Sequence, residues 1–181
     1  MTEPGTLHEI WRTASAAGPM QRVPAARLLA GRGLDGDRYA LGGGTWAQYP
    51  DLEKQVTLID RADVADVAAE AGVPLTPGDT RRNLVTAGVD LPALVGHWFA
   101  VGDALLFGMK RCPPCAHLER LTGARLVKAM VRRGGINAAV FGGAEIAEGA
   151  VVRPVPEEEA GRRGAPTGTG RPEPRMVPLP D

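Results

Sequence analysis

Short apolar segments separated by turn residues dominate the pattern along the chain. Strand-length segments rich in Val, Ile or Phe are Gln55–Ile59, Asn83–Thr86, Trp98–Val101, Ala104–Gly108, Ile136–Phe141 and Ala150–Arg153. Gly102–Asp103 joins two of them and predicts a tight hairpin, with Gly at the position that a type II′ turn requires. Gly142–Gly143, which precedes Ala144, indicates a second hairpin.

Two segments have helical periodicity instead. The first runs from Arg61 to about Ala71, with Asp60 as its N-cap and Gly72 as its stop. Its expected apolar face consists of Val64, Val67, Ala68 and Ala71. The second is expected to begin at the cap Thr122 and to end near Gly134. Its expected buried side consists of Leu126, Met130 and Val127.

Many strands and few helices, without a regular strand–helix alternation, favour a mainly β barrel with peripheral helices (α+β) over a doubly wound sheet. Apolar residues make up 44% of the chain and aromatic residues 4%, so the core must consist mainly of Val, Leu, Ala and Ile. We expect one domain over residues 1–154. Residues 155–181, rich in Pro, Gly and Arg, have few core-forming side chains and are expected to be a disordered tail or, alternatively, a docking segment.

Charge and hydropathy exclude several classes of protein. With 21 basic and 21 acidic residues, the chain has no global positive field that would attract nucleic acid or an anionic membrane. No apolar stretch is long enough to predict a transmembrane helix, and residues 1–10 do not resemble a signal peptide. We therefore expect a cytoplasmic protein, in which two cysteines are more often functional or buried than joined in a structural disulfide.

The sequence Cys112-Pro113-Pro114-Cys115 is the sharpest chemical feature. Two prolines fix φ and stiffen what we expect to be a turn, so that the thiols are held in position. The neighbouring Lys110 and Arg111 favour the thiolate, which is the nucleophilic and metal-ligating form. The pattern therefore predicts a metal ligand or a nucleophile, with Cys115 as the candidate.

Other interpretations of the two cysteines remain open. A thioredoxin-like redox pair would need a strand before it and a helix that starts at the second cysteine, within a βαβ unit, whereas a hairpin followed by a loop is expected here. A c-type haem site is excluded because Ala116 stands where its histidine would be. A structural zinc site could use Cys112, Cys115 and His117 but lacks a fourth ligand in the pattern. Finally, both cysteines could be buried and inert.

Two arginines are candidates to bind an anion. Arg81 precedes the expected strand at Asn83–Thr86, and Arg38 follows a Gly-Asp turn. A guanidinium matches the geometry of a phosphate, and the amide of Asn83 could hold the edge of a heterocycle or a backbone group. The alternative is a solvated turn in which Asp79 pairs with one arginine.

Taken in order, these segments resemble the MOSC family, the domain found at the C-terminus of molybdenum cofactor sulfurases and in standalone bacterial proteins. The match runs from about Leu7 to Pro154. Its parts are Gly36-Asp37-Arg38, Arg81-x-Asn83-Leu84-Val85, Gly88-Val89-Asp90-Leu91, Leu94-Val95-Gly96, Phe99-x-Val101-Gly102, Cys112-Pro113-Pro114-Cys115, Gly134-Gly135 and Glu148-Gly149 before Ala150–Arg153.

The resemblance implies a MOSC-type β-barrel and a site that binds the molybdenum–pterin cofactor, with Cys115 as the ligand to molybdenum. Arg38 and Arg81 would hold the cofactor's phosphate, Asn83 the pterin edge, and Cys112 is a further cofactor-binding candidate. Members of this kind reduce N-hydroxylated bases and related small molecules. Other members are proposed to carry sulfur on the cysteine, and pyridoxal phosphate binding is another association of the family.

The chain also departs from the family. Standalone members often have a His-Gly-Gly stretch after the Gly-Asp-Arg element, but here the corresponding residues 41–46 contain no histidine. No electron-transfer domain is present, so a reductase would need an external electron-transfer protein. A sulfur carrier that uses a Cys115 persulfide would instead need a cysteine desulfurase, and a third alternative is a non-catalytic module that binds the cofactor or zinc.

Overall fold

The computed structural model describes residues 3–44, 54–166 and 172, and within them the architecture is a closed β-barrel. In order around the barrel, its seven strands are β1 (Gly5–Arg12), β11 (Val151–Pro154), β7 (Trp98–Val101), β8 (Ala104–Arg111), β9 (Ile136–Gly142), β5 (Val56–Asp60) and β6 (Leu84–Ala87), which pairs with β1 again. All neighbouring pairs are antiparallel except β5 and β6. The expected fold, a mainly β barrel with peripheral helices, is confirmed.

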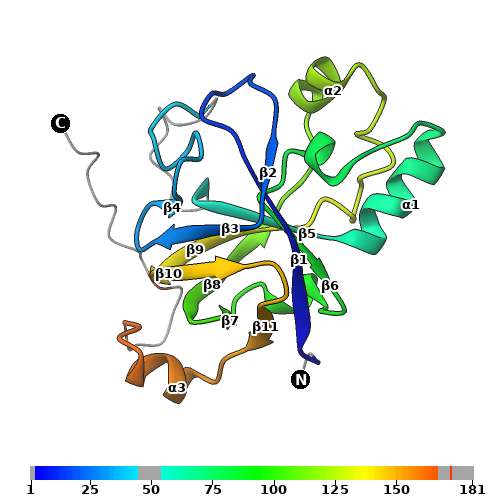
Figure 1. Cartoon of the computed structure of the whole chain (residues 1–181). Helices are drawn as coiled ribbons and strands as arrows, with labels where there is room; N and C mark the ends of the chain where they lie inside the picture. The colour runs from blue at the N-terminus through cyan, green and yellow to red at the C-terminus, as the bar shows by residue number, and fades with distance from the viewer. Residues whose placement is uncertain (1–2, 45–53, 167–171, 173–181) are drawn as a thin grey trace.

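A second, smaller sheet lies beside the barrel (Figure 1). It consists of β10 (Ala144–Ala147), β3 (Ala25–Leu29) and β4 (Gly33–Leu34), while β2 (Gln21–Val23) extends the large sheet from β1. Helices α1 (Arg61–Ala71) and α2 (Ala116–Thr122) flank one side of the barrel, and α3 (Glu157–Arg162) lies on the opposite side (Figure 1). Two 3₁₀ turns, η2 (Pro77–Thr80) and η3 (Leu91–Leu94), complete the described elements.

The barrel strands send alternate side chains to two different apolar clusters. On β7, Phe99 and Val101 belong to the cluster inside the barrel, whereas Trp98 and Ala100 belong to a cluster on its outer face. Both faces of this strand are covered, which explains why its sequence is continuously apolar rather than alternating. No helix among the described residues is long and apolar enough to cross a membrane.

The predicted strands and the first hairpin are found. Val101 pairs with Ala104 across Gly102–Asp103, as the turn residues predict. The second hairpin prediction, at Gly142–Gly143, is wrong, because β10 leaves β9 and pairs with β3. The N-terminal strand β1 was not predicted from the sequence, since a bulge between Leu7 and Glu9 interrupts its alternation of apolar and polar residues.

Only the first of the two helix predictions is confirmed. The Asp60 carboxylate accepts a hydrogen bond from the Ala62 N–H at 2.8 Å, and Gly72 ends α1 at a φ of 66°. Thr122 does not begin a helix but is the last residue of α2, and turns follow at residues 127–133. Leu126 and Met130 are nevertheless buried as expected, because successive turns can point apolar side chains toward α1 as a helix would.

The expected domain boundary at residue 154 is too early. Val155, Ala160 and Ala165 are buried against the outer face of the barrel, in the same cluster as Trp98. Three apolar side chains in a polar segment are thus enough to dock α3, and the ordered structure continues to residue 166. The rest of the expected tail lies outside the described residues, apart from residue 172.

Candidate functional site

A pocket of about 420 Å³ lies where β8 ends and β6 begins. Among the described residues, its lining contains no Asp or Glu, but it contains the cations Arg38, Lys54, Arg81, Arg82 and Lys110. The remaining lining residues are Ala16, Tyr39, Thr57, Cys112, Pro113, Cys115, His117, Leu118 and Asn137. The chain as a whole is neutral, so this concentration of positive charge is local and favours an anionic ligand.

The structure brings together Arg38, Arg81, Cys112 and Cys115, residues that the sequence singled out from three separate segments. Asn83 does not line the pocket. This convergence follows from the barrel register, which runs from Arg111 at the end of β8 through Ile136 and Leu58 to Leu84 at the start of β6.

The segment that carries the cysteines is more extended than expected. No turn or bend is assigned at residues 112–115, and the residue before a proline is sterically biased toward extended backbone. Cys112 is half-buried, whereas Cys115 is exposed and directly precedes α2 as its N-cap residue. The expectation of a loop after the cysteines is therefore wrong, since a helix follows Cys115.

Two of the alternatives for the cysteines are not fully met by this geometry. A strand precedes Cys112 and a helix begins after Cys115, as a thioredoxin-like motif requires, but the connection leads to β9, which is antiparallel to β8, so the parallel βαβ unit is not formed. No three His, Cys, Asp or Glu side chains in the described part of the chain are arranged to hold a metal ion, which argues against structural zinc at Cys112, Cys115 and His117.

Arg38 is held in the pocket wall by its neighbour in sequence. Its Nη1 donates to Oδ2 of Asp37 at 3.2 Å, its Nη2 to the backbone oxygen of Arg81 at 3.4 Å, and its guanidinium lies over the ring of Tyr39. Asp37 is fully buried and Arg38 is 6% exposed. This paired charge is therefore fixed in one orientation before any ligand binds.

Asn83 has a different place from the one expected. Its Oδ1 accepts hydrogen bonds from the N–H and the Oγ1 of Thr57, and its Nδ2 donates to the Trp11 oxygen and to Asp37. A side-chain amide has two donors and one acceptor oxygen with two lone pairs, and the protein uses all of them. No donor or acceptor of the Asn83 amide is therefore left for the expected contact with a pterin edge. Instead, the residue links β1, β5 and the Asp37 segment.

Arg81 is the more available of the two predicted arginines. It is half-buried, forms no ion pair with the described residues, and donates to the backbone oxygens of Ala16 and Gly18 at 2.8 and 2.9 Å. Burial, together with the charge of Arg38, lowers the pKa of Arg81, although an arginine remains charged at neutral pH. Its backbone has a φ of 58°, which is unusual for a residue other than glycine. Such conformations tend to occur at functional sites.

The sequence analysis missed several residues of the pocket. Lys54 and Asn137 had no motif around them, and Arg82 stood unremarked beside Arg81. Burial raises the pKa of Tyr39, so its phenol stays protonated, and the ring packs against the backbone of Gly44, where a Cβ would be 2.4 Å from the ring. The only signal in the sequence for Tyr39 and Arg82 is that each stands directly beside a predicted site residue, Arg38 and Arg81 respectively.

Comparisons with known proteins agree with the barrel fold. The YuaD protein of Bacillus subtilis superposes with a TM-score of 0.71 at 15% identity, over 84% of this chain and 96% of that one. The YiiM proteins of Geobacillus stearothermophilus and Escherichia coli superpose with TM-scores of 0.63 and 0.60 at 17% and 19% identity. These matches cover 84% and 87% of this chain and 75% and 71% of those chains. At such identities they show a shared fold.

No curated protein is significantly similar to the chain. The profile of the MOSC domain matches residues 32–153, which is most of the barrel and includes Arg38, Arg81 and both cysteines. The chain therefore belongs to the MOSC domain family, which is associated with binding of the molybdenum cofactor.

Proposed function

We propose that this protein binds the molybdenum–pterin cofactor in the basic pocket, with Cys115 as the protein ligand to molybdenum, and reduces N-hydroxylated or similar small molecules. One observation carries the proposal. The exposed thiol of Cys115 lies in a pocket whose described lining has cationic side chains and no carboxylate.

The residues present fit such a group. A thiolate is a soft ligand suited to a redox-active metal, and the pterin ends in a phosphate that arginine binds well. Arg81 has no carboxylate partner among the described residues, so a phosphate would give this half-buried cation a counter-charge. The pocket volume also lies within the range of about 300–1,000 Å³ that is typical of small-molecule sites.

The bound molybdenum centre would supply the electron and oxygen-atom chemistry, and the protein would supply position and charge. Arg38 and Arg81 would orient the anionic cofactor. The overall reaction, R–NHOH + 2 e⁻ + 2 H⁺ → R–NH₂ + H₂O, consumes two protons, and the protonated Tyr39 is a donor within the same pocket. The electrons would come from an external electron-transfer protein.

Metal and cofactor analysis tests this proposal. Protein from a molybdenum-replete host is expected to contain molybdenum and an extractable pterin, and Cys115→Ser is expected to lose the metal. Cys112→Ser is the matched variant, which removes the other thiol and is expected to retain it. Wild-type protein that holds neither molybdenum nor pterin, even after reconstitution, would contradict the proposal.

Sulfur transfer is the second candidate, favoured by the exposure of Cys115 in the lining of the pocket. A thiolate there could take the outer sulfur of a donor persulfide, giving Cys115–S–SH and the donor's thiolate. Intact mass measured after incubation with a cysteine desulfurase and cysteine should then show one added sulfur on wild type and none on Cys115→Ser. We also propose a cytoplasmic location, where reducing conditions would keep the Cys115 thiol available for this transfer.

A further inference from the structure

We propose that Arg82 is the positioning residue for the cysteine segment, residues 112–115, and through it for the Cys115 thiol. The chemical consequence rests on the proposed function, in which Cys115 is the reactive or ligating thiol. The geometric claim concerns only how this chain holds the segment.

Arg82 is a buried cation whose described partners are backbone oxygens. It is 8% exposed, and its Nε donates to Gly134 at 2.8 Å, its Nη1 to Thr80 at 3.2 Å and its Nη2 to Cys112 at 3.1 Å. It forms no ion pair with a described carboxylate. A planar guanidinium presents several donors in a fixed fork, so one side chain joins the segment before β6, the loop before β9 and the cysteine segment.

Both the N–H and the carbonyl of Cys112 are anchored by hydrogen bonds. Its N–H donates to the Gly135 oxygen at 2.8 Å, and its carbonyl accepts from Arg82. Pro113 and Pro114 have no N–H and so cannot anchor the segment by donating hydrogen bonds of their own. Cys112 is the last residue before these stiff prolines, and a displacement of its carbonyl is therefore transmitted along them to Cys115.

The packing around this contact leaves little room for adjustment. A Cβ added to Gly134 would lie 2.1 Å from the Cys112 oxygen and 3.6 Å from Nη2 of Arg82. The glycine thus lets the backbone of the loop before β9 approach the cysteine segment. Arg82 and Gly134 are thus two positions at which the same carbonyl can be disturbed.

Arg82 differs in this respect from its neighbour Arg81. The guanidinium of Arg81 binds carbonyls of the loop at Ala16 and Gly18, whereas that of Arg82 binds the cysteine segment. We assign Arg81 to the ligand and Arg82 to the scaffold. Lysine at position 82 would keep the charge but could not reproduce the fork, so it should restore the positioning only in part.

Site-resolved alkylation of the metal-free protein tests the assignment. Iodoacetamide is applied at pH 9.5, above the usual thiol pKa of about 8.5, so that the rates report access rather than ionisation. In wild type, Cys115 should be labelled faster than the half-buried Cys112. Arg82→Ala should raise the Cys112-to-Cys115 labelling ratio roughly tenfold, since charge-assisted hydrogen bonds are lost, with a smaller change for Arg82→Lys.

Arg133→Ala is the matched control, because this partly exposed arginine pairs with Glu70 and does not contact the cysteine segment in any described interaction. Guanidinium ion at tens of millimolar should return the ratio of Arg82→Ala toward wild type, whereas urea at the same concentration should not. If Arg82→Ala does not fold, Gly134→Ala is the second variant, and the same rise in the ratio is expected from it.

A folded Arg82→Ala protein with the wild-type ratio would overturn the assignment, and so would an equal rise in Arg133→Ala. Because the assay uses no metal, it still decides the role of Arg82 if wild type binds no molybdenum. Conversely, wild type could bind molybdenum while Arg82→Ala is labelled like wild type. That pair of results would leave the proposed function intact and would show that Arg82 does not position the segment.

Discussion

The side-chain amide of Asn83 donates a hydrogen bond of 3.1 Å to the buried carboxylate of Asp37. The same carboxylate oxygen accepts from Nη1 of Arg38 at 3.2 Å and from the N–H of Thr13 at 3.3 Å. Two motifs that are far apart in the sequence are thus joined behind the pocket wall. Asn83 contributes to the site through Asp37, by fixing the group that fixes Arg38.

Asp37→Ala should destabilise the protein by about 3–5 kcal/mol, because it leaves a buried arginine without its carboxylate. Urea unfolding followed by circular dichroism measures the change. Asp103→Ala is the control, since Asp103 lies exposed at the β7–β8 hairpin, and its cost should stay below about 0.5 kcal/mol. Equal stabilities of the two variants would show that the Asp37–Arg38 pair contributes nothing.

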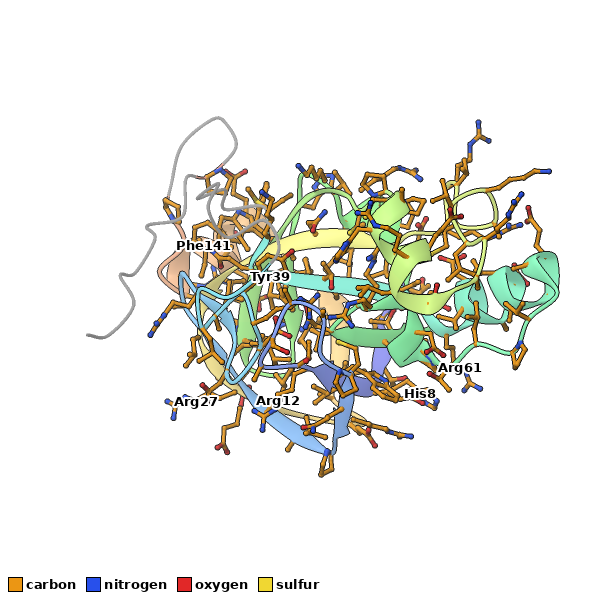
Figure 2. All side chains as sticks on the ribbon, turned by 90° about the horizontal axis from the view of Figure 1, so that it is seen from above. His8, Arg12, Arg27, Tyr39, Arg61 and Phe141 are labelled. Atoms are coloured by element: carbon orange, nitrogen blue, oxygen red, sulfur yellow. The ribbon has the colours of Figure 1, made fainter. Side chains whose placement is uncertain are left out.

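Arg81→Gln should weaken the binding of a phosphate-bearing anion roughly tenfold, because one charge-assisted contact is removed from the pocket. Calorimetric titration with inorganic pyrophosphate at low ionic strength is the measurement. Arg27→Gln is the control, since Arg27 is exposed on β3 and does not line the pocket; Figure 2 shows it at the opposite side of the molecule from Arg61. Unchanged affinity in Arg81→Gln would place the anion elsewhere.

The positions of the strands were the most predictable part of the fold, because short apolar segments between turn residues typically form strands. The ends of the strands were less predictable, because they depend on the neighbouring strands with which they pair. β8 was expected to end at Gly108 but continues to Arg111, where it pairs with Ile136 of β9. The loss of the helix at residues 124–134 has a local cause, since Gly123 ends α2 at a φ of 70° and the Glu119 carboxylate accepts from the Val127 N–H.

Four residues of the pocket lining, Arg38, Arg81, Cys112 and Cys115, were predictable from the ordered motifs. Lys54 and Asn137 were not, and the sequence did not show what each residue does. Nothing in the sequence distinguishes Asn83, whose amide is fully used by the protein, from an amide that is free to bind a ligand. The approach of Gly134 to Cys112 joins residues far apart in the sequence and follows from the pairing of Arg111 with Ile136 between β8 and β9. Such contacts belong to the tertiary structure, and they underlie the different roles that we propose for the adjacent Arg81 and Arg82.

Cys112 and Cys115 should not form a disulfide with each other when the folded protein is treated with diamide. Three residues of extended, proline-stiffened backbone span about 9 Å, whereas a disulfide needs Cα atoms within roughly 7 Å. Oxidation would remove two protons and two electrons, so an intramolecular bond would appear as a loss of 2 Da that denaturing alkylation does not reverse.

The double variant Pro113→Gly/Pro114→Gly is the matched comparison for this test. Glycine removes the restriction on φ and lets the segment fold back on itself, so diamide should then produce the intramolecular disulfide. A disulfide formed equally fast in wild type would contradict the extended geometry and revive the redox interpretation of the two cysteines.

Acid should release α3 before the barrel unfolds, because the helix is tied to β11 by the ion pair between Arg153 and Glu159. The hydrogen bond from Arg153 lowers the pKa of Glu159 below its usual 4.5. A lowered pKa in the folded state means that the stabilisation is complete above this usual value and is lost as the pH falls through the lowered one.

Hydrogen exchange of the amides in Glu157–Arg162, measured as a function of pH and corrected for the intrinsic rate, should therefore show falling protection below about pH 4.5. Glu159→Gln should reduce this protection already at neutral pH and remove its pH dependence, while Glu157→Gln, which changes an exposed residue of the same helix, should behave as wild type.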